Sequence, residues 1–191
     1  LVDPRNPDAI RVGVSCAGVW ETTDGGATWA NINEGMSNEY MPPNQQRDPI
    51  AQDIHQLAHC AGAPDVVWCQ HHSGIYRSED AGHTWTEVTA AKPSAFGFAV
   101  VAHPRDPKTA WFVPAIKDEK RYPVDAKIVV SRTRDGGKSF EVLHKGLPQR
   151  HAYDLVYRHA LAVDDSGERL AFGSTSGGLW VSDDGGESWK S

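Results

Sequence analysis

The stretch Ser78-Glu79-Asp80-Ala81-Gly82-His83-Thr84-Trp85 carries a pattern, Ser/Thr-x-Asp-x-Gly-x-x-aromatic, that occurs four times in the chain. The other copies begin at Thr22, Thr133 and Ser182, and successive aspartates are 56, 55 and 49 residues apart. A repeat with a period of roughly 40 to 50 residues is typical of the blades of a β-propeller, each a four-stranded antiparallel sheet. The chain is therefore predicted to be all-β, with about 3.5 to 4 blades.

The residue types within each copy fit a tight turn between two strands. An aspartate carboxylate can accept backbone N–H bonds, while the Ser or Thr hydroxyl two residues earlier bonds locally. Glycine supplies a positive φ without steric cost, and the aromatic ring is large enough to fill the wedge between neighbouring sheets. The residues predicted to be structural are Asp24, Gly26, Trp29, Asp80, Gly82, Trp85, Asp135, Gly137, Phe140, Asp184, Gly186 and Trp189.

This pattern resembles the Asp-box, or BNR, repeat of sialidases, xyloglucanases, sortilin-type receptors and many sialidase-like or glycosyl-hydrolase-like bacterial propellers. In those families the box joins the third and fourth strands of a blade, on the face opposite the ligand site. The resemblance implies a single propeller domain over residues 1–191, with blade breaks near 31–53, 89–97 and 144–154. Because such propellers use about six or seven blades, the chain is expected to be part of a larger ring.

A second repeated feature is a cluster of Pro, Gly or Asp residues between two apolar runs in each blade. Such clusters are predicted to form the hairpin between the first and second strands. They lie at residues 3–8, 62–65, 103–108 and 164–168. In the fourth blade the innermost strand is predicted over Leu155–Val163, which carries Arg158 and His159, and the last strand is predicted from Glu187 onward.

Composition excludes several functional classes. The formal net charge of −6 comes from 25 acidic and 19 basic residues without a basic stripe, so nucleic acid is not an expected partner. No run of eighteen apolar residues occurs, and no membrane span is expected in this stretch. Cys16, Cys60 and Cys69 lack C-x-x-C spacing and are predicted to be buried free thiols, which favours a reducing, cytoplasmic compartment.

A ligand site is predicted on the face opposite the Asp-containing turns, where the loops between second and third strands meet the connections between blades. No cofactor motif occurs, so none is expected. Metal is not part of the main prediction, although Asp53, His55 and one of His71 or His72 form an alternative ligand set. The candidate residues for binding a carbohydrate, peptide or protein are His55, His71, His72, Arg121, Arg150, Tyr153 and Arg158.

Two functions follow from the resemblance, and the first is a binding or scaffold module. The alternative is a glycoside hydrolase. In a sialidase-like site, Arg121, Arg150 and Arg158 would bind the substrate carboxylate and Tyr153 would be the nucleophile. In a xyloglucanase-like site two aspartates would act as acid and base, and the candidates on the expected face are Asp48, Asp53, Asp118 and Asp154. No catalytic set is assigned from the sequence.

Overall fold

The computed structural model describes all 191 residues and consists of antiparallel sheets joined by turns and three short 3-10 helices. The first sheet contains β1 (Val2–Asp3), β2 (Asn6–Val14), β3 (Gly18–Thr22) and β4 (Ala30–Asn31). The second contains β5 (Ile54–Cys60), β6 (Ala63–His71), β7 (Gly74–Ser78) and β8 (Thr86–Glu87). The third contains β9 (Gly97–Ala102), β10 (Ala110–Pro114), β11 (Val130–Thr133) and β12 (Glu141–Leu143).

The fourth sheet has three strands, β13 (Leu161–Val163), β14 (Leu170–Gly173) and β15 (Leu179–Ser182). The 3-10 helices lie in the connections and are η1 (Pro49–Ala51), η2 (Val124–Ala126) and η3 (Arg158–Ala160). In every sheet, each strand pairs with its sequence neighbour, as in a propeller blade. The structure contains no helix of the length and apolar character needed to span a membrane.

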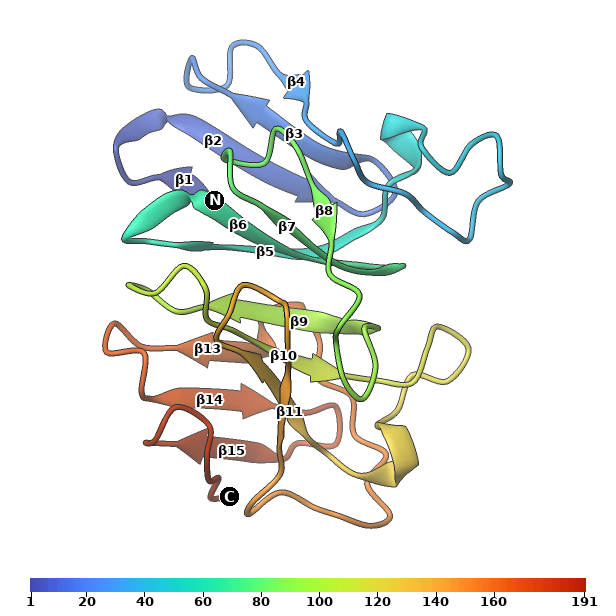
Figure 1. The fold of residues 1–191 in the computed structure, drawn as a ribbon, viewed down its shortest axis with the longest axis vertical. Coiled ribbons are helices and arrows are strands. Elements are labelled where there is room, and N and C mark those ends of the chain that lie inside the picture. Colours follow the sequence, from blue (N-terminus) through green and yellow to red (C-terminus); the bar gives the residue numbers. More distant parts are fainter.

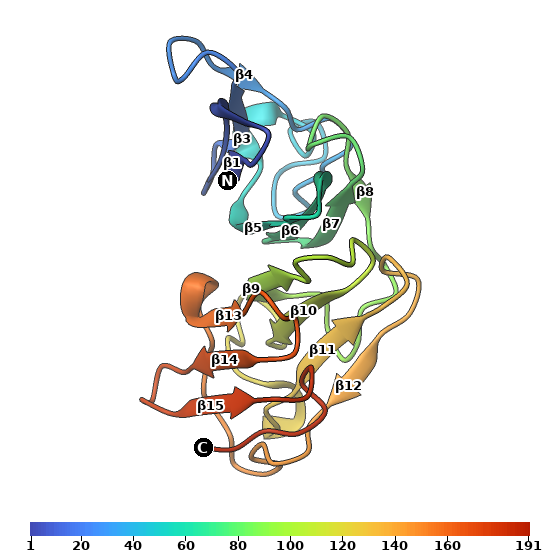
Figure 2. The same ribbon diagram turned by 90° about the vertical axis from the view of Figure 1, so that its left-hand side faces the viewer.

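The four sheets follow one another in a row, with the first and last at opposite ends (Figures 1 and 2). The inner strands of neighbouring sheets face each other, since β2 contacts β5, β5 contacts β9 and β9 contacts β13. This is the arrangement of consecutive propeller blades, so the all-β propeller prediction is confirmed. The row is open, and the four sheets do not form a closed ring.

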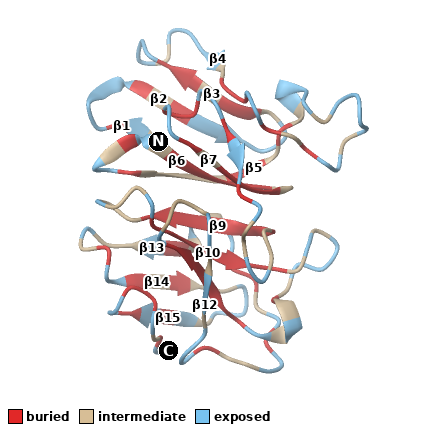
Figure 3. Cartoon of the chain, viewed as in Figure 1, coloured by how far each residue is buried: buried red, intermediate tan, exposed pale blue.

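The hydrophobic core lies in layers between the sheets (Figure 3). The layer between the first two sheets includes Val19, Ile32 and Trp85, and the layer between the second and third is built on Trp68 and Phe112. The largest layer, of 14 buried residues, joins the third and fourth sheets. Each sheet is therefore stabilised mainly by burying apolar area against its neighbour.

Each of the four Asp-containing turns has the same pattern of hydrogen bonds. In the second turn, Ser78 Oγ donates to Asp80 Oδ1 (2.7 Å) and accepts from the Gly82 N–H (2.8 Å). Thr84 donates its N–H to Asp80 Oδ1 (2.8 Å) and its hydroxyl to Oδ2 (2.6 Å). The same four bonds recur in the other turns. The aspartates are thus occupied by the turn itself.

Each turn is also tied to the first hairpin of its own sheet. The N–H of Ala81 donates to the Asp65 carbonyl (2.8 Å), and equivalent bonds join Gly25 to Asp8 and Gly136 to Lys108. The fourth turn repeats this bond between Gly185 and Glu168 (2.8 Å). The two repeated sequence features therefore lie at the same end of the strands.

Four details of the sequence prediction are wrong. Leu155–Val163 is not one strand, because Leu155 exchanges hydrogen bonds with Thr175 and η3 precedes β13. Beyond Glu187 only one bridge, Val181 to Lys190, extends the fourth sheet. Cys16 is exposed, although Cys60 and Cys69 are buried and free. Trp29 is 42% exposed, since no sheet of the chain lies on that side of the first blade.

Candidate functional site

The strand ends opposite the turns bring together side chains from three connections. Asp53 immediately precedes β5, His55 is its second residue, and His72 lies in the turn between β6 and β7. The pairing of β5 with β6 skips His55, between the pairs Ile54–His71 and Gln56–Gln70. This bulge interrupts the alternation of side chains and lies next to the site.

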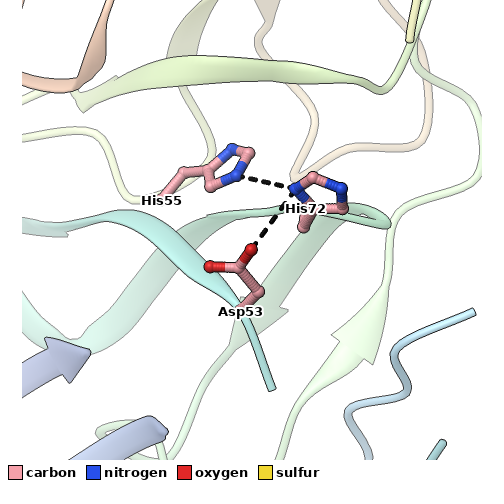
Figure 4. Close-up of side chains that lie close together, drawn as sticks. All are labelled: Asp53, His55 and His72. Atoms are coloured by element: carbon pink, nitrogen blue, oxygen red, sulfur yellow. Dashed lines mark hydrogen bonds and ion pairs between the residues drawn. The ribbon is translucent and has the colours of Figure 1, made fainter. Parts of the chain in front are cut away.

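His72 is at the centre of the cluster (Figure 4). Its Nδ1 lies 3.1 Å from His55 Nε2 and 3.4 Å from Asp53 Oδ2. Its Nε2 lies 3.6 Å from Asp118 Oδ1, on the loop that follows β10. One imidazole is therefore flanked by another imidazole and by carboxylates from two different sheets.

Neighbouring groups fix the orientation of the other two side chains. His55 Nδ1 is 2.6 Å from the Gly97 carbonyl, which accepts only an N–H, so the hydrogen is on Nδ1 and Nε2 carries a lone pair. The ring also stacks on Phe98, with centroids 4.4 Å apart. The Ser15 hydroxyl donates to Asp53 Oδ1 at 2.5 Å and leaves Oδ2 directed toward His72.

Burial and local charge set the ionisation of the cluster. Burial lowers the pKa of His55 to about 4, so the ring is neutral at neutral pH. For Asp53, burial acts to raise the pKa, but the Ser15 hydrogen bond and the neighbouring histidines outweigh it and lower the pKa. Asp53 is therefore an ionised acceptor beside the neutral imidazole of His55.

His71 lies beneath the cluster and is fully buried. The N–H of Asp53 points at its Nε2 (3.1 Å) and the N–H of Ser73 at its Nδ1 (3.0 Å). A neutral imidazole has one acceptor nitrogen, so it accepts one of these bonds at a time. Burial lowers the pKa of His71 to about 3. Its role is to hold the backbone on which Asp53 and Ser73 lie.

Aromatic and charged side chains surround His72. Tyr40, from the connection between the first and second sheets, packs edge-on against it with centroids 4.5 Å apart. Arg121 hydrogen-bonds the Asp118 carboxylate and places its guanidinium 5.6 Å from the Phe98 ring centre. Tyr157, 47% exposed, packs on the same Phe98 ring. These contacts join Tyr40 to the cluster directly, and join Arg121 and Tyr157 to it through Phe98, which stacks on His55.

The remaining candidates make no hydrogen bond, ion pair or ring contact with His72. Tyr153, 63% exposed, packs against Tyr122. Arg150 is exposed and has no ion-pair partner. Arg158 is on η3 and not on a strand, and its Nε is buried without a hydrogen-bond partner. Its charge is a minor contribution to the lowered pKa of His55, after burial.

Two of the four candidate carboxylates are used elsewhere. Asp48 caps η1 by accepting from the Ile50 N–H (3.1 Å), and Asp154 accepts from the Ser174 hydroxyl (2.8 Å). Only Asp53 and Asp118 face the same imidazole.

Sequence reasoning missed the residues that orient the cluster, namely Ser15, Gly97 and Phe98. Ser15 belongs to the first sheet's β2–β3 turn and the other two to β9, so no local spacing links them to Asp53 or His55. It also missed the second Ser or Thr of each turn, which follows the aspartate by four residues and donates to it. That signal was present, since the residue before every aromatic is Thr28, Thr84, Ser139 or Ser188.

Comparison with known proteins identifies a shared fold. No protein-family model and no curated protein matches the chain. Among solved structures, an ancestral GH74 enzyme superposes with a TM-score of 0.73 at 15% identity, over 100% of this chain and 23% of that one. The GH74 enzyme of Niastella koreensis superposes with a TM-score of 0.64 at 17% identity, over 99% of this chain and 28% of that one. The chain thus spans about a quarter of the length of each.

Proposed function

We propose that the chain is a binding module of the Asp-box propeller type, and that a carbohydrate binds to the surface around His72. The observation that carries this proposal is the convergence of three connections from three sheets on one imidazole. Tyr40 comes from the first connection, His72 from a turn of the second sheet and Asp118 from a loop of the third. Binding sites are commonly formed by loops held on a rigid scaffold of this kind.

The chemistry of the surface suits a sugar. Tyr40 and Tyr157 are 44% and 47% exposed, and each offers an apolar ring face with a polar hydroxyl. Asp118 and Arg121 lie beside them and can exchange hydrogen bonds with sugar hydroxyls. The shared fold of the GH74 enzymes supports this class of ligand in a general way.

The test measures the affinity of the chain for a panel of neutral and acidic oligosaccharides by isothermal titration calorimetry. We expect one class of oligosaccharide, neutral or acidic, to bind. Tyr40→Ala and Tyr157→Ala should each weaken the affinity for it about tenfold, which is about 1.4 kcal/mol. Trp29→Ala is the matched control, because it removes an exposed ring at the opposite end of a blade. Binding that is equally sensitive to Trp29→Ala, or no binding by any oligosaccharide, would contradict the proposal.

A glycoside hydrolase is the second candidate, favoured by the position of Asp53 and Asp118 on either side of His72. Such an enzyme needs one carboxyl group that stays protonated as a general acid. The lowered pKa of Asp53 does not suit that role, although it suits a base. Chromogenic glycosides distinguish the two functions, since hydrolysis that disappears in both Asp53→Asn and Asp118→Asn would support the enzyme.

The sialidase-like arrangement has less support. Arg121 is bonded to Asp118, while the ring of Tyr153 packs against Tyr122. No hydrogen bond or ion pair joins Arg121, Arg150, Arg158 or Tyr153 to one another. A sialoside in the same panel tests this option directly.

A further inference from the structure

The three side chains at the centre of the cluster have the composition of a metal-binding site. Asp53 offers a carboxylate oxygen, His55 its Nε2 and His72 its Nδ1, and these atoms all lie within 4.8 Å of one another. Figure 4 shows His55 and Asp53 both directed toward the same ring nitrogen of His72. They come from two neighbouring segments, the start of β5 and the turn after β6.

The spacing between the donor atoms fits coordination to one ion. A tetrahedral zinc site with bonds of about 2.0 to 2.1 Å places its ligand atoms about 3.3 Å apart. The separations are 3.1 Å between the two histidine nitrogens and 3.4 Å between His72 Nδ1 and Asp53 Oδ2, and the third pair, His55 Nε2 and the Asp53 carboxylate, lies within 4.8 Å. Two of the three separations therefore match those of a tetrahedral site.

Groups outside the cluster orient the donors as metal sites require. A metal-ligating histidine usually donates its remote N–H to a carbonyl or a carboxylate, which fixes the tautomer. His55 does this with the Gly97 carbonyl, and His72 presents its remote Nε2 to Asp118. Asp53 is held in turn by the Ser15 hydroxyl.

The site is also open to one side. His55 lines a surface hollow together with Arg11, Gln56 and His159. The side chains of His72 and Asp53 are 12% and 15% exposed, so solvent reaches these two donors as well.

We propose that Asp53, His55 and His72 bind one divalent transition-metal ion of the zinc or cobalt type. Two imidazoles and one carboxylate select these ions over calcium and magnesium, which prefer oxygen ligands. Three protein ligands leave at least one coordination position open, as in catalytic zinc sites. Metal binding does not depend on the carbohydrate proposal and is tested without any sugar.

The experiment uses the chelator-treated chain without a histidine tag. Titration with Co²⁺ should give visible ligand-field absorption that saturates at one ion per chain, and Zn²⁺ should displace it. His72→Ala and Asp53→Asn should each weaken Co²⁺ binding at least tenfold, since even an outer partner of a metal ligand is worth about 10- to 100-fold. The matched controls are His144→Ala and Asp165→Asn, both of exposed residues outside the cluster.

Circular dichroism verifies that each variant is folded. Asp53→Asn preserves the shape of the side chain, so the test remains available if His72→Ala fails to fold. As a second readout, Zn²⁺ should raise the melting temperature of the unmodified chain and not of Asp53→Asn. Absence of saturable Co²⁺ absorption, or equal affinity in His72→Ala, Asp53→Asn and the controls, would overturn the proposal.

Discussion

At the scale of single residues, Ala81 distinguishes the second Asp-containing turn from the other three. It adopts φ +64°, where the corresponding residues are Gly25 (+68°), Gly136 (+77°) and Gly185 (+67°). The left-handed region costs an L-residue with a Cβ about 1 to 2 kcal/mol, whereas glycine adopts it freely. The conformation persists because the Ala81 N–H bonds the Asp65 carbonyl.

Replacing Ala81 with glycine should therefore stabilise the chain. We expect Ala81→Gly to raise the free energy of unfolding by up to about 1 kcal/mol, because relief of strain exceeds the added entropy of the unfolded chain. The reverse change, Gly136→Ala, should lower it by about 1 kcal/mol. A Cβ there meets no atom closer than 3.6 Å, so the effect is one of backbone strain. Urea unfolding measures both, and a destabilised Ala81→Gly would contradict the explanation.

At the scale of the element, each Asp-containing turn is closed by its own side chains. The Asp80 carboxylate accepts from Ser78 and twice from Thr84, and the turn joins β7 to β8. Equivalent bonds lower the pKa of Asp135 and of Asp184 to about 2. The stabilisation they provide is thus present above the ordinary aspartate pKa of 3.8 and is lost as the pH falls toward 2.

Removing one of these carboxylates should affect stability and leave ligand binding intact. We expect Asp80→Ala to lower the free energy of unfolding by about 1 to 3 kcal/mol, because the Thr84 N–H loses its acceptor. Affinity for any ligand should be unchanged once the variant is folded, since Asp80 and His72 lie at opposite ends of β7. Denaturant unfolding and calorimetry of the same sample check both parts. A variant of unchanged stability that no longer binds would assign the turns to the site.

At the scale of the whole molecule, stability comes from the layers between sheets. Trp85 is buried against the first sheet, and its Nε1–H donates to the Ile32 carbonyl (2.9 Å). The equivalent Trp29 has no sheet beside it and bonds only the Gly26 carbonyl of its own turn (3.2 Å). The same sequence position therefore has a different energetic role in the first and second blades.

The two tryptophans provide a direct test of this packing. We expect Trp85→Ala to lower the free energy of unfolding by about 3 to 5 kcal/mol, as for other buried aromatics. Trp29→Ala should cost about 1 kcal/mol or less, because its ring is already half in water and loses one hydrogen bond. Chemical unfolding of both variants makes the comparison. Equal losses of unfolding free energy would mean that the tryptophan ring stabilises the turn and not the layer between sheets.

The sequence by itself determined the repeat, the all-β class and the residues of each turn. These features depend on contacts within about eight residues, so Ser78, Asp80 and Gly82 meet wherever the rest of the chain lies. The ends of strands were harder to predict from the sequence. Leu155 is not part of β13, because it hydrogen-bonds Thr175, which lies in another loop.

The sequence grouped Asp53 and His55 with one of His71 or His72, but only the tertiary structure decided for His72 and added Asp118. His55, His72, Asp53 and Asp118 are all visible in the sequence, yet so are Arg150 and Tyr153, which make no hydrogen bond or ion pair with them. The selection depends on how the third sheet packs on the second, because that packing brings Gly97 to His55 and Asp118 to His72. Contacts between sheets join residues far apart in the sequence, so no local spacing predicts them. The turns are formed by residues within a few positions of one another, so their sequence pattern predicts their geometry.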